Sequence, residues 1–259
     1  MSPSKPEINT STGIVIKIND LGEADRIITL ITPNFGLIRG VAKSARKTVS
    51  KLGGHFDILK YVNFSIRETK SISQLSQATT IYGYKKIRTD LNLFFQTSYI
   101  SEIAEKFSIE NNANLTLFNL LKNTLDYIEE FGFTENLLHF YELKILETNG
   151  FAPELYKCVE SENILEPGNH YYCPERGGLI DFKYSNLKGN LTLLPANLNT
   201  IKYMRYLSKS SMEKINNLSI DEIYEKQASR ILKIQIKNIV DRNLKSEKFI
   251  TKKLWKKMK

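Results

Sequence analysis

The sequence predicts an α+β fold in which a small five-stranded β-barrel precedes an all-α region with a knuckle-like insert. Three observations support this class. Apolar and polar residues alternate between Gly13 and about Thr80, apolar residues recur at helical spacing beyond Tyr84, and a turn-rich, cysteine-containing stretch interrupts the helices after Gly150. With 259 residues, of which 41% are apolar, the chain is long enough to bury a sizeable core.

Five short strands are expected in the barrel segment. The first starts at Gly13, and the residues before it are expected to form a frayed tail. Runs at 26–32 and 37–42 flank the turn formers Pro33-Asn34-Phe35-Gly36 and predict a hairpin. After a break at Gly53-Gly54, runs at 58–67 and 72–78 supply the last two strands. Five strands in so short a segment are typical of a small barrel.

The helical region begins with a good capping signal. Asp90 precedes an i, i+4 series from Leu91 to Phe107, and Asp is a favoured N-cap residue. Further helical series end before Gly150 and resume from Leu198. The predicted domains are therefore a barrel at 1–80, a helical domain at 81–150 and 191–250, an insert at 151–190 and a basic tail at 251–259.

Composition favours a polyanionic partner and a reducing compartment. The formal net charge is +9 and the pI about 9.3, although a Lys- and Asn-rich composition of this kind also arises in low-GC genomes. Two cysteines give no disulfide framework, and neither a signal peptide nor a membrane span is expected. We expect a cytoplasmic, nucleoid-associated protein that binds no membrane.

The strongest candidate site is a one-signed run of charge after the third strand. It comprises Arg39, Lys43, Arg46, Lys47 and Lys51, and no acidic residue occurs between Asp25 and Asp57 to neutralise it. Loops of this kind on small barrels commonly flank an oligonucleotide-binding face. The alternative is an ordinary solvated loop whose charges serve solubility. We favour phosphate contact, because such contact requires clustered charge of one sign.

Single-strand binding also requires flat side chains on which bases can stack. Phe35, Phe56, Tyr61 and Phe64 lie in or near the barrel. Phe64 shares its parity with Val62 and Ile66 and is predicted to point inward, whereas Tyr61 has the opposite parity. Tyr61 is therefore a stacking candidate. The lysine-rich carboxy-terminal run could extend the anion-binding surface or could be disordered, and both readings stay open.

A metal or catalytic reading finds little support in the sequence. Cys158, His170 and Cys173 are weak zinc candidates, because the Cys-x-x-Cys pair of structural zinc sites is absent, and two buried reduced thiols are the favoured reading. Phosphate-loop, dinucleotide, zincin and nucleophile-elbow motifs are missing as well. His139 lies in an apolar helix and is predicted to be a packed residue. We expect neither a cofactor nor an enzyme.

Several long motifs, in order, carry a resemblance to a known family. They are TGIVIKINDLGEADRIITLITPNFGLIRGVAKSARK, KLGG at 51–54, LLHFYELKILETNGFAPELYKC, YYCPERGGLI and NLKSEKFI. Through these motifs, which extend over nearly its whole length, the chain resembles the bacterial RecO family of recombination mediators. The resemblance implies an amino-terminal OB-fold and a helical domain, with a four-cysteine zinc module in many members.

The resemblance also implies function, partners and site residues. Family members bind single- and double-stranded DNA, anneal strands, and work with RecR to load RecA onto DNA coated by single-stranded-DNA-binding protein in RecF-type repair. They also capture the acidic carboxy-terminal tail of that coating protein beside a hydrophobic pocket of the helical domain. The implied DNA site comprises Arg39, Lys43, Arg46, Lys47 and Lys51, with Arg26 on the neighbouring strand.

The chain departs from the family pattern in the zinc module. Ser161, Asp181 and Tyr184 stand where the family has cysteines, so a metal-free knuckle is expected. Two other hypotheses remain beside the leading one of a DNA-binding mediator. They are a protein-interaction adaptor whose DNA contact is incidental, and an RNA-binding barrel protein.

Overall fold

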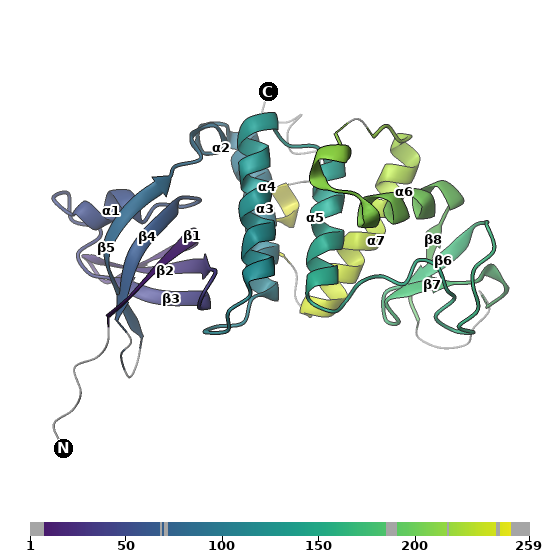
Figure 1. The fold of residues 1–259 in the computed structure, drawn as a ribbon, viewed down its shortest axis with the longest axis horizontal. Coiled ribbons are helices and arrows are strands. Elements are labelled where there is room, and N and C mark those ends of the chain that lie inside the picture. The colour runs from purple at the N-terminus through teal and green to yellow at the C-terminus, as the bar shows by residue number, and fades with distance from the viewer. Residues whose placement is uncertain are drawn as a thin grey trace, which may run out of the picture. The chain divides into compact units, whose positions relative to one another are not determined.

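The computed structural model describes residues 8–67, 69, 72–184, 191–216, 218–241 and 244–249. By their mutual contacts these residues separate into two compact units. Unit 1 holds the described residues up to Gly132 and those from Ser246 onward, and unit 2 runs from Phe133 to Lys245. The predicted α+β class is confirmed, because five strands come first and helices with a small insert follow (Figure 1).

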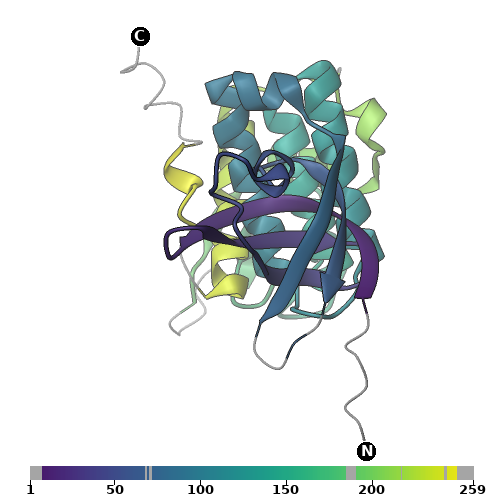
Figure 2. The same ribbon diagram turned by 90° about the vertical axis from the view of Figure 1, so that its left-hand side faces the viewer.

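The strands of unit 1 close into a barrel. They are β1 (Ile8–Leu21), β2 (Asp25–Thr32), β3 (Gly36–Ala42), β4 (Tyr61–Arg67) and β5 (Ser73–Tyr82). Neighbouring strands follow the order β1-β2-β3-β5-β4, and β1 also pairs with β4 (Figure 2). The β3–β5 pair is parallel and the others are antiparallel. Closure leaves no long unpaired edge on which another chain could add.

The first strand is longer than predicted. Residues from Ile8 to Ile14 pair in antiparallel register with Arg67 to Tyr61 of β4, so the expected frayed tail is wrong for residues 8–12. This stretch is too polar to show an alternating apolar pattern, and it is the pairing with β4 that fixes it as a strand. Residues 1–7 lie outside the described residues. At its other end, β5 continues to Tyr82, beyond the predicted limit at Ala78.

Alternate side chains of the strands fill the barrel. The buried cluster includes Val15, Ile28, Leu30, Ile38, Phe56, Val62, Phe64, Ile66 and Leu75. Phe64 is fully buried, which confirms the prediction that it points inward. Gly36 has a φ of +63°, and a Cβ there would lie 1.9 Å from the carbonyl oxygen of Asn112. The hairpin therefore needs glycine both for its turn and for its close contact with the 109–112 loop.

The Gly53-Gly54 stretch is helical, which the sequence analysis did not predict. Helix α1 (Lys51–His55) follows an N-cap at Ser50, whose hydroxyl oxygen accepts a hydrogen bond from the Leu52 amide. A Cβ on Gly53 would lie 2.2 Å from the Ala45 carbonyl oxygen. Gly53 therefore allows a short helix to pack closely against the preceding loop, and the glycine pair does not act as a break.

Three helices complete unit 1. They are α2 (Lys85–Thr89), α3 (Leu91–Phe107) and α4 (Leu115–Phe131). The predicted cap is confirmed, since the Asp90 carboxylate accepts hydrogen bonds from the amides of Asn92 and Leu93. Glu129 of α4 accepts hydrogen bonds from the amides of Lys86 and Ile87. Its carboxylate thus ties α2 to α4 by satisfying free amides in the first turn of α2.

Unit 2 is built on three helices, α5 (Glu135–Thr148), α6 (Leu198–Lys209) and α7 (Glu222–Val240), which contact one another. His139 is fully buried in α5, and its Nδ1 lies 2.9 Å from the Tyr203 hydroxyl oxygen. This confirms the prediction of a packed histidine. Gly150 follows the helix with a φ of +81°, in keeping with its predicted place just past a helix end.

The insert between α5 and α6 forms a small antiparallel sheet in the order β7-β6-β8. Its strands are β6 (His170–Cys173), β7 (Gly178–Ile180) and β8 (Leu194–Ala196). Short 3-10 helices η1 (Phe182–Tyr184) and η2 (Met212–Lys214) follow β7 and α6 respectively.

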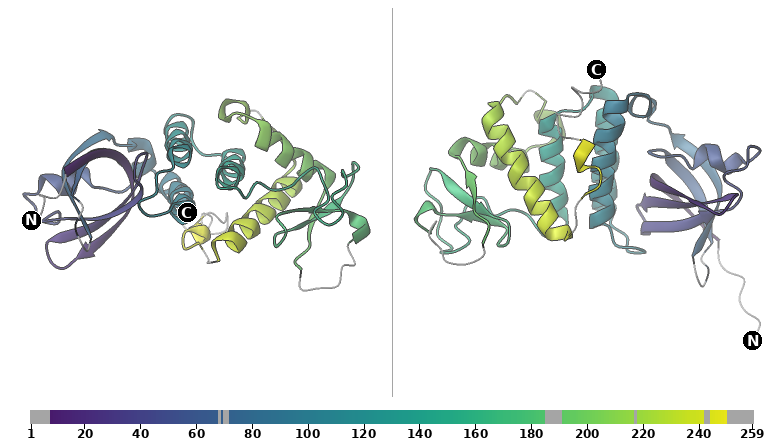
Figure 3. Two further views of the ribbon diagram at one scale, coloured as in Figure 1. Left: turned by 60° about the horizontal axis from the view of Figure 1, so that its bottom comes forward. Right: turned by 180° about the vertical axis from the view of Figure 1, so that it is seen from behind.

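After α7 the chain returns to unit 1. Ser246 donates its amide hydrogen to the Glu102 carboxylate of α3 at 2.8 Å, and η3 (Glu247–Phe249) contacts the same helix (Figure 3). The basic tail predicted at 251–259 lies outside the described residues. Within the described ranges, no helix combines the length and apolarity that a membrane crossing requires.

Candidate nucleic-acid interface

The predicted basic run extends from Arg39 on β3 to Lys51 at the start of α1, and its middle part lies on a folded loop, here called the β3–α1 loop (residues 43–50). Ser44 has a φ of +57°, and its amide donates to Asp25 Oδ1 at 2.7 Å. The Arg46 amide donates to the Ala24 carbonyl at 2.9 Å. These bonds hold the loop against the turn between β1 and β2, so little conformational entropy would be lost when it contacts a ligand.

The arginines around this loop already have acidic partners. Arg39 pairs with Glu105 at 3.6 Å and Glu110 at 3.3 Å, both distant in sequence. Asp20 lies 3.5 Å from Arg46 and 3.4 Å from Arg26. The expectation that nothing neutralises the run is therefore wrong for Arg39 and Arg46, because the acids come from other elements of unit 1.

The lysines differ from the arginines. Lys43, Lys47 and Lys51 are exposed, and none of them has an ion-pair partner in the part of the chain that the structure describes. Val49 between them is 89% exposed. Three free ammonium groups within nine residues can exchange mobile counterions for the phosphates of a nucleic acid. We call these three the loop lysines.

Tyr61 is half-buried and does not present a free ring. Its hydroxyl hydrogen-bonds to Thr12 at 3.2 Å, its ring centroid lies 6.1 Å from that of Phe118, and Lys122 Nζ lies 5.9 Å from the ring. It lines a cavity of about 700 Å³ together with Asp126, Glu129 and Glu130. These carboxylates would repel phosphates, so the surroundings of Tyr61 disfavour base stacking.

The other aromatic residues near the barrel are also committed to packing. Phe56 and Phe64 are fully buried, with ring centroids 6.1 Å apart, and Phe35 packs against the same core. Of the residues that the sequence singled out on the barrel, the loop lysines alone are both exposed and unpaired among the described residues. The barrel interface is therefore suited to phosphate contact and not to base reading.

The cysteines of the insert are buried and unpaired, as predicted. Cys173 donates from Sγ to Glu175 at 3.3 Å, and burial raises its pKa. Burial also acts to raise the pKa of Cys158, but hydrogen bonds from the Asp181 amide and from Ser161 outweigh it and lower that pKa.

These residues do not fit a four-ligand zinc site. His170 Nε2 lies 2.9 Å from the Glu166 carbonyl oxygen, and the Cys173 thiol is hydrogen-bonded to the Glu175 carboxylate. No group of three or more His, Cys, Asp or Glu side chains within the described ranges could hold a metal ion.

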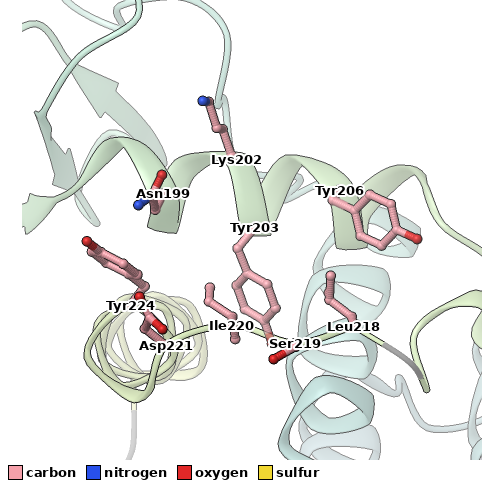
Figure 4. Close-up of a pocket in the computed structure, with 9 residues that line it drawn as sticks. All are labelled: Asn199, Lys202, Tyr203, Tyr206, Leu218, Ser219, Ile220, Asp221 and Tyr224. Carbon is pink, nitrogen blue, oxygen red and sulfur yellow. The ribbon is translucent and has the colours of Figure 1, made fainter.

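Unit 2 contains two adjoining cavities that the sequence analysis missed. The first, here called the α6 pocket, has a volume of about 490 Å³ and is lined by tyrosines, two aliphatic side chains and polar groups that include Lys202 and Asp221. In Figure 4, Tyr203 points from α6 toward Ile220, whereas Lys202 extends on the opposite side of the helix. The exposed Lys202 therefore stands at the border of this pocket.

The second cavity has a volume of about 530 Å³ and shares Lys202 and Tyr206 with the α6 pocket. We call its wall the α6 basic surface, formed by Tyr156, Lys202, Arg205, Tyr206, Lys209 and Lys214. A helical signal at 198–209 was visible in the sequence. The convergence with Tyr156 and Lys214 was not, because it depends on how the insert and η2 fold back on α6.

A closed five-stranded barrel joined to helices with a three-stranded insert defines a protein of the OB-fold class. The model of the amino-terminal domain of recombination protein O matches residues 7–84, and that of its carboxy-terminal domain matches residues 88–248. The chain belongs to the RecO family, and the resemblance noted from the sequence is confirmed.

Individual relatives agree with the family match. The DNA repair protein RecO of Dehalococcoides mccartyi is 34% identical over 243 residues, which cover 94% of this chain and 95% of the relative. The DNA repair protein RecO of Roseiflexus sp. is 26% identical over 95% of this chain and 86% of its own length. The similarity therefore spans both units.

Proposed function

We propose that the chain is a non-enzymatic, DNA-binding recombination mediator of DNA repair, which binds and anneals strands. The observation that carries this proposal is the set of three loop lysines, exposed and without acidic partners among the described residues, on an OB-type barrel of a RecO family member. Their ammonium groups bind phosphates, which occur in every sequence and in both single and double strands.

The barrel arginines play a different part in this proposal. Arg46 Nη1 donates to the Gly22 carbonyl at 2.6 Å and its Nε pairs with Asp20, so it orders the loop that carries the lysines. Arg39 and Arg26 are also paired, and they can turn to a phosphate only by exchanging one anionic partner for another. The binding free energy gained when a paired arginine turns to a phosphate is therefore smaller than the gain for an unpaired lysine.

The proposed partners follow the family. They are RecR, the acidic tail of single-stranded-DNA-binding protein and, indirectly, RecA, with loading of RecA onto coated DNA as the outcome. The α6 pocket supports the tail contact through its apolar part alone, because aliphatic and aromatic side chains line it, whereas Lys202 extends away from them and Asp221 is part of the lining (Figure 4). Such a pocket suits an apolar side chain of the tail. This contact also favours the adaptor as a second candidate function.

The direct test replaces the loop lysines with alanine. We expect K43A/K47A/K51A to weaken single-strand binding on the order of tenfold at low salt, and to reduce the salt slope by about 0.7 for each lost phosphate contact. The matched control, K85A/K106A/K237A, removes three other exposed lysines and leaves affinity unchanged. Unchanged affinity and slope in the loop variant would contradict the proposal.

Two further measurements separate the alternatives. Strand annealing with and without single-stranded-DNA-binding protein tests DNA binding and partner recruitment together. If the loop variant anneals and recruits normally, the adaptor reading is favoured. Competition between DNA and RNA oligonucleotides tests the RNA-binding reading, since RNA alone offers a 2′-hydroxyl.

A further inference from the structure

We propose that the α6 basic surface of unit 2 is a second nucleic-acid site, which holds one single strand while the loop lysines hold another. The inference rests on the proposed annealing function and adds to it a site to which neither the sequence motifs nor the family match assigns a role. The chain would thus carry one strand site on each of its two units.

The cations of this surface are arranged along one side of α6. Lys202, Arg205 and Lys209 follow one another at i, i+3 and i+7, so they lie on one helix face and span about 10 Å of its axis. Lys214, from η2, lines the same cavity. At the rise of about 3.4 Å per nucleotide of a stacked strand, this row can meet roughly three successive phosphates.

An aromatic ring holds two of the cations in place. The guanidinium carbon of Arg205 lies 4.5 Å and Lys209 Nζ lies 4.6 Å from the ring centroid of Tyr156. Arg205 Nε also donates to the Leu155 carbonyl at 2.8 Å. The guanidinium is therefore oriented before a ligand arrives, which reduces the entropy lost on binding.

The surface carries an excess of positive charge, although Glu213 interacts with the neighbouring Lys214. Lys202, Arg205, Lys209 and Lys214 have no ion-pair partner in the described ranges, and no carboxylate lines the described part of this cavity. Arg39 and Arg46 of the barrel, by contrast, face acids. The density of free cations at the α6 basic surface therefore matches that of the loop lysines.

The chemistry of the lining favours nucleotides over an acidic peptide. Besides its cations, the described lining of the cavity comprises two tyrosines and Ser210, and it includes no aliphatic side chain. Tyr206 is 45% exposed and offers ring surface to a base, whereas the 39% exposed ring of Tyr156 positions two of the cations. Stacking on aromatic and guanidinium planes suits single strands, whereas an apolar peptide side chain would require an aliphatic pocket.

Annealing gives such a second site a purpose. Two strands repel each other through their phosphates, and a protein that pairs them must neutralise both while their bases stay free. A single cationic loop neutralises one strand at a time. A second surface of free cations on the same chain allows both strands to be held at once.

The test counts strands bound to the full-length chain. We expect the unaltered protein to bind two non-complementary oligonucleotides of about 10 nucleotides, a length within the range that one OB-fold occupies. K209A/K214A should bind one, keep its affinity for the first strand within about twofold, and anneal complementary strands about tenfold more slowly. Tyr156→Leu should weaken the second strand without a change of charge.

The control is R230A/K237A, which removes two other exposed cations of unit 2 and should behave as the unaltered protein. The inference is overturned if the unaltered chain binds one strand, or if K209A/K214A still binds two. A third result would also overturn it: K209A/K214A no longer binds an acidic peptide with an apolar end, yet still binds the second oligonucleotide. A different result would contradict the proposed function, namely that K43A/K47A/K51A binds the first oligonucleotide as tightly as the unaltered protein does.

Discussion

Arg39 Nη1 lies 3.3 Å from Glu110 Oε2, a carboxylate 71 residues further along the chain. This carboxylate competes with any phosphate for the same guanidinium. We expect Glu110→Gln to raise single-strand affinity by about twofold to fivefold at low salt and to steepen the salt slope by up to about 0.7. Titrations of a labelled oligonucleotide at several salt concentrations measure both. A decrease in affinity would show that the pair orders the interface and does not mask it.

Removal of a single buried hydroxyl should destabilise unit 1. Tyr84 is 1% exposed, and its hydroxyl donates to Asp126 Oδ1 at 2.7 Å. Tyr84→Phe should lower the free energy of unfolding by about 1–2 kcal/mol in urea denaturation, because a hydrogen bond to a carboxylate is lost. Tyr82→Phe is the matched control, since Tyr82 is 48% exposed and its replacement should be neutral. Equal effects of the two substitutions would contradict this account.

Acid should destabilise the protein through His139. Burial, and after it the charge of Lys233, lowers the pKa of His139 to about 3, whereas a histidine in the unfolded chain has its ordinary value near 6.5. Between those values the unfolded state binds a proton that the folded state does not, so the free energy of unfolding decreases as the pH falls. From pH 7 to pH 5 the loss through this one group is about 2 kcal/mol.

The variant His139→Gln isolates that contribution. Gln does not titrate, so unfolding measured at pH 7 and pH 5 should show a pH-dependent loss about 2 kcal/mol smaller than in the unaltered protein. For each protein, the free energy of unfolding at pH 5 is subtracted from that at pH 7. This subtraction cancels any pH-independent loss of stability that the substitution itself causes. An identical loss in both proteins would show that His139 is protonated in the folded state.

Zinc should be neither bound nor needed. Cys173 and His170 are hydrogen-bonded to Glu175 and to a carbonyl, and Ser161 replaces a family cysteine. Elemental analysis of purified protein should find zinc far below one equivalent, and dialysis against a chelator should leave the melting temperature unchanged. A stoichiometric metal content, or a fall in melting temperature with chelator, would contradict this prediction.

Local signals in the sequence predicted local structure well. Asp90 caps α3 as its position before an apolar series indicated, and the parity of Phe64 placed it in the barrel core. Such signals depend on neighbours within a few residues. The polar start of β1 has no comparable signal, because its partner in β4 lies about fifty residues away in sequence.

The candidate site was harder to predict, because the acidic partners of a basic side chain can come from residues that are distant in sequence. The run around Arg46 has no acid near it in sequence, yet Asp20 lies 3.5 Å away. The parity of Tyr61 gave its side of the strand correctly but could not reveal that Phe118 packs against it. The α6 basic surface likewise brings Tyr156 together with a helix that begins at Leu198.

The return of the chain to α3 through Ser246 bears on the order in which the protein can fold during synthesis. Unit 2 is continuous from Phe133 to Lys245, whereas unit 1 lacks the contact of Ser246 with Glu102 until the residues that follow unit 2 have been synthesised. The barrel and helices α2 to α4 can therefore fold first, and the Ser246–Glu102 contact is added only after unit 2 has been made. A truncation just after α7 would accordingly weaken the barrel-bearing unit while leaving the covalent continuity of the other intact.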